Sequence, residues 1–370
     1  MNEVDYRFFL DKKYEKETKA KCGCKYFSNV NLHVEVLENA LILPGDNQGR
    51  GGILFQGEML PQSSYRRGVA RLYEFDENDV FNSDEEVVWI GMWPTVWGHC
   101  LTDNVKHLWF LFHPEYDYLK KYKMLYSTIW GTTFDEKHNF WQLLRIWGID
   151  TGNICRLEKP TRFKRVFLPD ESFIHTDEGK FYTKEFALLY DNTTIPTPKK
   201  RIPLYDKVYF TRTGWGGGKD FGEKRIETAF RKMGYHVLCP EILELDELIC
   251  VLRNCKVLAT TEGSISHNCL FLEKGTKVVI IRKAYYVNMY QLAINEIREL
   301  QVTIIDSHKS VGVSSVNPML GPFFLYCGKN LQKFAPNIKL GKFPLIDFLI
   351  YLRKSKYIRK SIKRILTNMF

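Results

Sequence analysis

Apolar and polar positions follow a regular order between residues 207 and 283, and this order predicts alternating strands and helices. Apolar runs typical of buried strands occupy 207–212, 235–238, 257–261 and 277–281. Between them, apolar residues recur at helical spacing over 222–233 and 245–252, and Gly234 follows the first of these helices as a stop signal. This alternation indicates right-handed parallel crossovers and an α/β domain of the nucleotide-binding type.

Elsewhere the same reasoning predicts further elements of both kinds. Strands are expected at 31–43, 87–90, 125–129, 165–168 and 302–305, and helices at 135–147, 184–190, 287–300 and 343–357. Residues 1–30 are charged and show no clear periodicity, so we expect irregular structure there.

Two polar loops follow strands of the 207–283 series, where ligands bind in parallel sheets. The loop 211–220 places Arg212 and Lys219 on either side of glycines whose amides can approach an anion closely. It is not a Walker loop, because Thr213 stands where the first glycine is required. The loop 260–268 leads into a helix start, where free amides and the helix dipole favour phosphate.

The alternative explanation of the two loops is a helix cap at Ser264 and a glycine-rich surface turn. Because they follow strand ends of one sheet, we favour a nucleotide site, in which Glu262 accepts hydrogen bonds from ribose hydroxyls. The residues expected to bind the nucleotide are Arg212, Lys219, Glu262, Gly263, Ser264, Ser266, His267 and Asn268.

A second informative segment, 99–113, has the spacing of an amphipathic helix. Its apolar residues fall on one side, while His99, Asp103, Lys106 and His107 fall on the other. His99 and Asp103 are one turn apart, so their side chains can touch. A solvated polar face is the simplest explanation of these residue types, and a site that contains a base is the alternative.

The composition excludes several classes of protein. A chain of 370 residues with 45% hydrophobic residues is long enough for two domains and too apolar for general disorder. The sequence lacks a run of about 18 apolar residues and an apolar signal core at its start, so we expect a cytoplasmic location.

The nine cysteines and the acids give no sign of a metal site. Several cysteines fall within apolar strands or helices, as buried reduced thiols do. Cys22 and Cys24 form a close pair, but no second Cys/His pair stands at zinc spacing, and no Asp-x-Asp pair is apparent. We predict that the protein needs no metal and no cofactor.

The net charge of +10 is concentrated at the C-terminal end. Residues 353–370 contain seven Lys or Arg and no acid, and apolar residues recur at helical spacing through them. This pattern is typical of a basic amphipathic helix on an anionic membrane, here the inner face of the cytoplasmic membrane. The alternative is a terminal helix packed on the protein. Nucleic acid is not expected as a partner, because no recognisable RNA-binding motif accompanies the charge.

The order and spacing of five short motifs resemble glycosyltransferase family 61, which includes proteins of the capsular polysaccharide biosynthesis type. The motifs are Thr211-Arg212, 233–235 (Met-Gly-Tyr), Pro240-Glu241, 245–249 (Leu-Asp-Glu-Leu-Ile) and 261–271 (Thr-Glu-Gly-Ser-Ile-Ser-His-Asn-Cys-Leu-Phe). The resemblance spans about 89–282. The last motif departs from its commonest form, which has His at position 262 and Gly-Ala-Gly at 263–265.

The resemblance implies two Rossmann-like α/β domains that face a cleft, the GT-B arrangement. Residues 1–195 would be the acceptor-side domain, 196–205 a proline-rich linker, 206–345 the nucleotide-sugar-binding domain and 346–370 the basic helix. A surface-polysaccharide context is implied as well.

The implied reaction is transfer of a sugar, with inversion, from a nucleotide-sugar such as a UDP-sugar to a hydroxyl of a glycan or lipid-linked glycan. His99 and Asp103 match the N-terminal motif of the family, so we predict Asp103 as general base and His99 as its orienting partner or as a donor to the leaving phosphate. Alternatives are a noncatalytic nucleotide- or glycan-binding component of a polysaccharide assembly complex, and a GT-B-like sugar-nucleotide epimerase.

Overall fold

The structure, a computed structural model, describes residues 4–67, 72–176, 178–194, 197–198, 202–214, 220–309 and 321–354. The chain divides into two compact units. The N-terminal unit comprises residues 25–196, and the C-terminal unit comprises residues 1–24 together with 197–370. The division near residue 196 falls at the start of the predicted linker.

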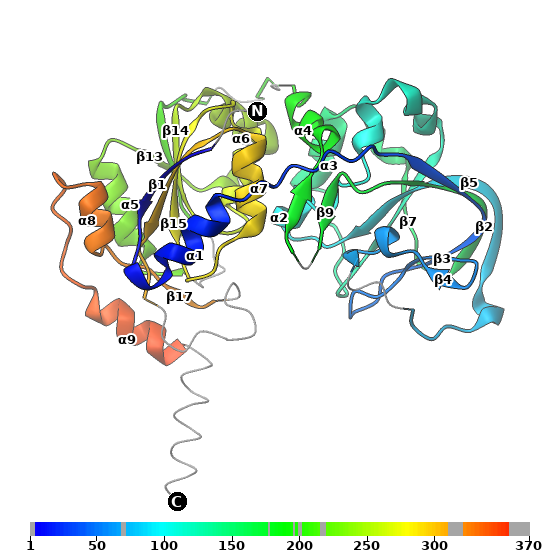
Figure 1. The fold of residues 1–370 in the computed structure, drawn as a ribbon, viewed down its shortest axis with the longest axis horizontal. Coiled ribbons are helices and arrows are strands. Elements are labelled where there is room, and N and C mark those ends of the chain that lie inside the picture. The colour runs from blue at the N-terminus through cyan, green and yellow to red at the C-terminus, as the bar shows by residue number, and fades with distance from the viewer. Residues whose placement is uncertain are drawn as a thin grey trace, which may run out of the picture. The chain divides into compact units, whose positions relative to one another are not determined.

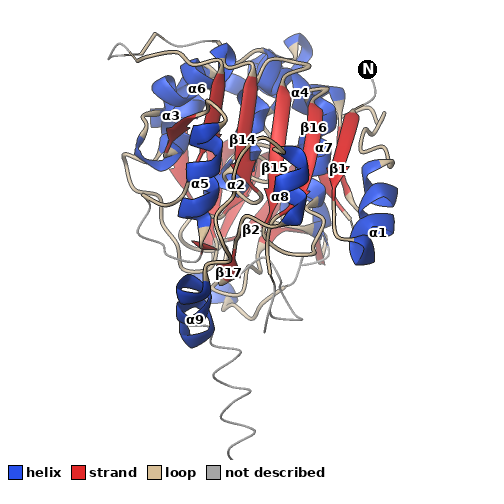
Figure 2. Ribbon diagram, turned by 90° about the vertical axis from the view of Figure 1, so that its left-hand side faces the viewer, coloured by secondary structure: helices blue, strands red, loops and turns tan. Residues whose placement is uncertain are grey.

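The C-terminal unit is built on a six-stranded sheet whose neighbouring strands are all parallel. Its strand order is β1-β16-β15-β14-β11-β13 (Figure 2). The strands are β1 (Asp5–Phe9), β11 (Lys207–Phe210), β13 (His236–Leu238), β14 (Val257–Thr261), β15 (Lys277–Arg282) and β16 (Gln301–Asp306). The predicted α/β character and the strands of the 207–283 series are therefore confirmed.

Helices cover both faces of this sheet, with α5 and α8 on one face and α6 and α7 on the other (Figure 1). They are α1 (Lys12–Cys22), α5 (Glu223–Lys232), α6 (Leu245–Asn254), α7 (Met289–Ile297), α8 (Lys329–Phe334) and α9 (Leu345–Lys354). On α5 the apolar residues Ile226, Ala229 and Phe230 point inward and join Tyr209 and Ile281 in one buried cluster. The apolar residues that recur with a 3.6-residue period in the sequence thus form the face of α5 that packs on the sheet.

The first 24 residues correct the predicted domain boundary. They belong to the C-terminal unit, where β1 pairs with β16 and α1 follows it. The backbone amide of Asp11 donates to Asp306 Oδ2 at 2.8 Å, and Arg282 Nη1 donates to Thr18 Oγ1 at 2.8 Å. Edge pairing and these long-range contacts order a segment that has no periodicity of its own.

The N-terminal unit has a mixed seven-stranded sheet of order β4-β3-β2-β8-β5-β6-β7. Its strands are β2 (Val34–Leu43), β3 (Gly52–Phe55), β4 (Glu58–Met59), β5 (Phe81–Trp93), β6 (Lys123–Thr128), β7 (Ile154–Arg156) and β8 (Thr161–Pro169). β5 pairs in parallel with β6 and β8, whereas β2 runs antiparallel to β3 and β8. This unit is α/β, but its mixed sheet differs from the Rossmann-like domain that we expected.

The remaining helices of this unit are α2 (Trp97–Cys100), α3 (Asn139–Ile146) and α4 (Lys184–Asp191), and a hairpin is formed by β9 (Phe173–His175) and β10 (Lys180–Tyr182). The predicted helix over 99–113 is wrong. In this range only His99 and Cys100, the last two residues of α2, are α-helical, and they are followed by turns and a short 3-10 helix, Trp109–Phe112. Residues 100–111 are all buried, so this segment has no solvated side.

Tertiary hydrogen bonds explain why this segment is not a helix. His107 Nδ1 lies 2.7 Å from the carbonyl oxygen of Pro169, and Lys106 Nζ donates to the carbonyl oxygen of Ser64 at 2.9 Å. The polar residues that were expected to face water are thus bound to neighbouring loops, and contacts of this kind override local periodicity.

Within the described residues, no helix has both the length and the apolar character required to cross a membrane. The basic segment predicted to lie on a membrane, 353–370, falls outside the described residues from 355 onward.

Candidate functional site

In the N-terminal unit, His99 and Asp103 form a hydrogen-bonded pair beside α2. His99 Nδ1 lies 2.7 Å from Asp103 Oδ2, and the same oxygen accepts a hydrogen bond from Thr102 Oγ1 at 3.0 Å. The predicted contact therefore exists, although a compact turn rather than a regular helix creates it. The His99 side chain is 24% exposed and the Asp103 side chain only 3% exposed. Of the two, the imidazole is the group that a substrate can reach.

Asp103 is held in its ionised form. Burial alone would raise its pKa, but His99, Arg66 and Lys106 together bring the pKa well below its ordinary value. An ionised carboxylate can only accept hydrogen bonds, so the proton of neutral His99 is on Nδ1. His99 Nε2 is then the nitrogen that can accept a proton from a substrate.

Aromatic residues surround His99. Tyr65 Oη lies 3.0 Å from His99 Nδ1, and the ring of Trp130 lies edge-on to both rings, with centroids 5.1 Å from Tyr65 and 6.3 Å from His99. Arg66 Nη2 donates to Tyr65 Oη at 3.0 Å. This setting combines a titratable group with aromatic surface, which suits a sugar ring. Neither Tyr65 nor Trp130 carries a spacing signal that the sequence could have revealed.

A buried ion pair fixes the segment that carries Tyr65. Lys106 Nζ lies 2.6 Å from Glu171 Oε1 and also donates to the carbonyl oxygens of Ser64 and Tyr65, at 2.9 and 3.2 Å. Arg67 is the second partner of Glu171. Because Lys106 and Glu171 are buried and bound to each other, they hold the 64–67 loop in one position against His99.

In the C-terminal unit, the strand order places the switch point of the sheet between β11 and β14. After residue 200 the strands of this sheet lie in the order β13-β11-β14-β15-β16. The chain passes from β11 to its neighbour β13 on one side, and then returns to β14 on the other side of β11. Ligands in such sheets bind at this point, outside the carboxyl ends of the strands. Arg212 lies two residues after the end of β11, and Glu262 follows β14 directly, so the described parts of the two predicted loops flank the switch point.

Lys283 joins Arg212 at this edge, and the sequence prediction missed it. It follows the last residue of β15, and its Nζ lies 3.3 Å from Asp220 Oδ2. A β-carbon built on Gly263 would lie 3.6 Å from the same nitrogen, so Lys283 is adjacent to the second loop. Its position after a parallel strand is the signal that could have identified it.

Arg212 is 22% exposed and lies among carboxylates. Its Nε is 3.4 Å from Glu241 Oε1, and its Nη1 is 3.9 Å from Asp220 Oδ2. Its backbone amide donates to Glu223 Oε1 at 3.2 Å. Burial, followed by the charge of Asp220, raises the pKa of Glu223 to about 7, so near neutral pH this carboxyl does not carry a full negative charge.

Glu262 lies inside the protein rather than on the ligand side. It is 4% exposed, its Oε1 accepts from the backbone amide of Asn288 at 3.3 Å, and its Oε2 has no hydrogen-bond partner in the part of the chain that the structure describes. Burial raises its pKa to about 7, although Arg282 and the Asn288 amide oppose this. A carboxyl that is buried in this way is better suited to carry a proton inside the protein than to bind ribose directly.

The titration of Glu262 leads to a prediction about stability. Its pKa is raised on folding, so its contribution is complete below the unfolded value of 4.5 and is lost as the pH rises to about 7. Glu262→Gln should therefore gain stability relative to the wild type between pH 5 and pH 8, by up to roughly 3 kcal/mol. Urea unfolding of both proteins at the two pH values measures this. An equal difference at both would show that Glu262 titrates normally.

The other residues of the second loop hold the loop itself. Ser266 Oγ donates to the carbonyl oxygen of Gly263 at 2.7 Å, and Asn268 Nδ2 donates to that of Ile265 at 2.9 Å. His267 is buried, with Nε2 3.5 Å from Asn288 Nδ2. Ser264 is half-buried in the same turn.

The predicted helix start in this loop is a short 3-10 helix, Ser266–Phe271, and the amide of Gly263 lies 3.2 Å from Ser266 Oγ. The amides are thus less available to an anion than we expected. Lys219 lies outside the described residues. Among the described residues, no group of three or more His, Cys, Asp or Glu is arranged to hold a metal ion.

Comparison with known proteins gives the class. Residues 97–279, which include the His99–Asp103 pair and both loops, match the family model described as Glycosyltransferase 61. The protein is a glycosyltransferase. It belongs to glycosyltransferase family 61, as the five motifs indicated.

Two solved structures that match this chain are distant from it in sequence. The dodecameric iron-containing glycosyltransferase TibC from enterotoxigenic E. coli H10407 is 10% identical, with 94% of this chain and 98% of that chain covered and a TM-score of 0.30. A TibC heptosyltransferase structure with ADP-D-beta-D-heptose is 12% identical, with 93% of each chain covered and a TM-score of 0.30. At these scores the similarity supports no conclusion about this chain. No curated protein matches the sequence.

Proposed function

We propose that the protein transfers a sugar, with inversion, from a nucleotide-sugar to a hydroxyl of a glycan or lipid-linked glycan in the synthesis of a surface polysaccharide, such as a capsule. The observation that carries the proposal is the pair of cations, Arg212 and Lys283, at the carboxyl edge of the sheet beside its switch point. Membership in the family favours this reading over a nucleotide site of another class.

In this proposal, Arg212 and Lys283 bind the diphosphate of the donor. Breaking the glycosidic bond leaves negative charge on the departing phosphate, and cations fixed in position stabilise that charge as it develops. Asp220 now holds Lys283, and Glu241 and Asp220 lie near Arg212. The carboxylates keep the two cations in place before the donor arrives, and the diphosphate would compete for them.

The proposed base differs from the one expected from the sequence. Asp103 is buried and bound to His99, whereas His99 is the more exposed member, with its Nε2 3.5 Å from Tyr65 Oη. We assign proton abstraction from the acceptor hydroxyl to His99 and the role of positioning and charge-stabilising partner to Asp103. General base catalysis of this kind contributes roughly 100- to 10,000-fold to the rate.

We propose the division of roles of a GT-B enzyme, in which the N-terminal unit binds the acceptor and the C-terminal unit binds the donor. The acceptor attacks the anomeric carbon from the side opposite the nucleotide, its proton passes to His99, and the nucleoside diphosphate leaves with the bonding electrons. Inversion follows from this single displacement.

A donor panel tests the proposal. The protein is incubated with UDP-, GDP- and CMP-linked sugars, with and without mixed glycan acceptors, and free nucleotide is measured. We expect release from one donor to rise with acceptor, and NMR of the product to show an inverted anomeric configuration. An epimeric donor formed without acceptor would instead indicate an epimerase.

Metal independence is a separate prediction of this scheme. Because Arg212 and Lys283 supply the positive charge at the diphosphate, turnover should be unchanged within about twofold after treatment with EDTA. Turnover is measured before treatment, after it, and after addition of manganese. Loss of activity that manganese restores would mean that a metal ion, rather than the two side chains, neutralises the leaving group.

A further inference from the structure

Helix α9 has an apolar face that is not covered by the described part of the protein. Leu345, Ile346, Leu349 and Ile350 are 60%, 74%, 55% and 43% exposed. Their spacing places them on one side of the helix, and Phe343, just before it, is 42% exposed. Isolated apolar residues on a surface are ordinary, but a contiguous group of this kind marks an interaction site.

The opposite side of α9 is firmly packed, so this face has a fixed position. Tyr351 is 1% exposed, and its ring lies 5.6 Å from that of Phe324 in β17 (Phe323–Phe324). Phe348 lies 4.9 Å from the same ring, and Phe221 of β12 (Asp220–Phe221) lies 5.9 Å from Tyr351. Figures 1 and 2 show α9 at the end of the C-terminal unit, beside β17. The helix thus has one face toward the protein and a second apolar face toward the outside.

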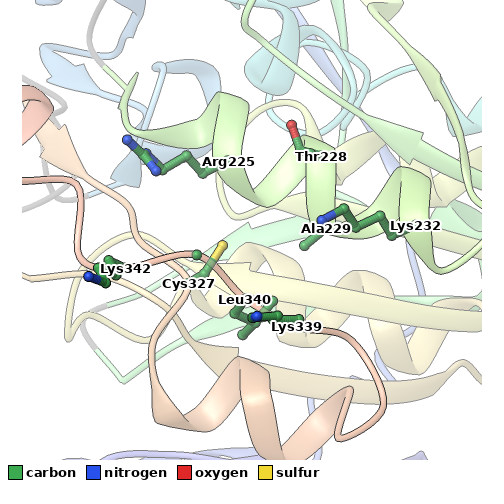
Figure 3. A pocket seen from close by; sticks show the side chains of 9 residues that line it. Arg225, Thr228, Ala229, Lys232, Cys327, Lys339, Leu340 and Lys342 are labelled. Carbon is green, nitrogen blue, oxygen red and sulfur yellow. The ribbon is translucent and has the colours of Figure 1, made fainter.

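A basic pocket lies close to α9 along the chain. It has a volume of about 230 Å³ and is lined by Arg225 and Lys232 of α5 and by Lys339 and Lys342 of the segment before α9. Figure 3 shows these side chains around a common hollow, with Cys327 between the helix and the segment. Four cations at one pocket favour an anion of the size of a phosphate group.

Contacts connect the pocket to the apolar face. Arg225 Nε lies 3.3 Å from Asp347 Oδ2 on the first turn of α9, and both side chains of this pair are exposed. Asp347 thus pairs with one of the four cations of the pocket. From residue 339 to residue 370 the sequence has nine Lys or Arg and a single acid, Asp347. The apolar face is therefore bordered by positive charge on both sides along the chain.

We propose that α9 and the basic pocket form a docking surface for an anionic phospholipid membrane. The apolar face of α9 would enter the boundary between headgroups and acyl chains, as interfacial helices do, and the pocket would bind a lipid phosphate. The charge selects this occupant, because a protein partner would need an equally extended acidic surface beside an apolar groove. The inference does not depend on the proposed reaction.

Sedimentation of the full chain with vesicles tests this surface. Vesicles of phosphatidylcholine alone are compared with vesicles that contain phosphatidylglycerol, and binding should require the anionic lipid. Ile346→Glu with Leu349→Glu should weaken binding at least about tenfold, because two apolar side chains no longer leave water. Lys339→Gln with Lys342→Gln should weaken it by about fivefold for each charge.

Two matched controls keep the test specific. Ile242→Glu changes a residue that is 77% exposed but lies in a different part of the unit, and Lys137→Gln removes an exposed charge from the N-terminal unit. Both should bind as the wild type does. The proposal is overturned if the α9 and pocket variants also bind as the wild type does. It is equally overturned if Ile346→Glu abolishes a concentration-dependent dimer of the protein but leaves its binding to vesicles unchanged, because the apolar face would then bind a second copy of the chain.

Discussion

Replacement of His99 by Gln, or of Asp103 by Asn, should lower kcat by roughly 100- to 10,000-fold with little change in the affinity for the donor. His99→Gln removes the proposed base. Asp103→Asn keeps the shape of the side chain at position 103 but removes the charge that holds the proton on His99 Nδ1. The imidazole can then adopt the other tautomer, in which Nε2 carries the proton and cannot act as a base. The measurement is steady-state turnover at saturating donor and acceptor.

The controls for this pair are chosen from the same unit. His33→Gln and Asp84→Asn change exposed residues whose side chains lie outside the His99 cluster, and they should retain wild-type kcat. If His99→Gln retained full activity while Asp103→Asn lost it, the carboxylate itself would be the base, as the sequence first indicated.

Removal of Arg212 or Lys283 should weaken binding of the nucleotide-sugar, by about 10- to 150-fold for each. A hydrogen bond to a charged group contributes about 1.5 to 3 kcal/mol, and the donor diphosphate would lose one such partner. Arg212→Ala also removes the cation beside Glu241, and the charge of this carboxylate would then repel the diphosphate. Calorimetric titration with UDP and with the donor identified by the panel measures the effect.

Lys256→Ala is the matched control for these variants. Its Nζ forms an exposed pair with Asp206 at 3.0 Å, and it precedes β14 rather than following it. Nucleotide affinity should be unchanged. If all three variants bound nucleotide equally well, the ligand would bind elsewhere than the carboxyl edge of the sheet.

The regular part of the C-terminal unit could be predicted because each of its elements carries its own pattern. The strands β14 and β15 each contain a buried apolar run, Leu258–Ala259 and Val278–Ile281, and α5 shows the period of a helix packed on one side. β1 could not be recognised in this way. It lies at the edge of the sheet, and its pairing with β16 depends on residues about 300 positions away.

The candidate site was only partly accessible to sequence reasoning. The spacing of His99 and Asp103 correctly indicated contact, because a tight turn brings residues i and i+4 together as a helix does. Their exposures depend on tertiary packing, such as that of Tyr65 against His99, so the relative roles of the two groups could not be read from spacing. Tyr65 is brought to its partner by tertiary structure alone, whereas the position of Lys283 directly after β15 could have identified it.

Transfer of an isotopically labelled sugar from its nucleotide to an acceptor tests the central claim most directly. We expect the wild-type protein to move the label into a glycan or lipid-linked glycan. We expect His99→Gln to bind the donor but to transfer the sugar at most about one hundredth as fast. A folded wild-type protein that binds nucleotide and leaves every donor intact with every acceptor would contradict the proposed sugar transfer. It would then be a noncatalytic binding component that retains the fold of the family.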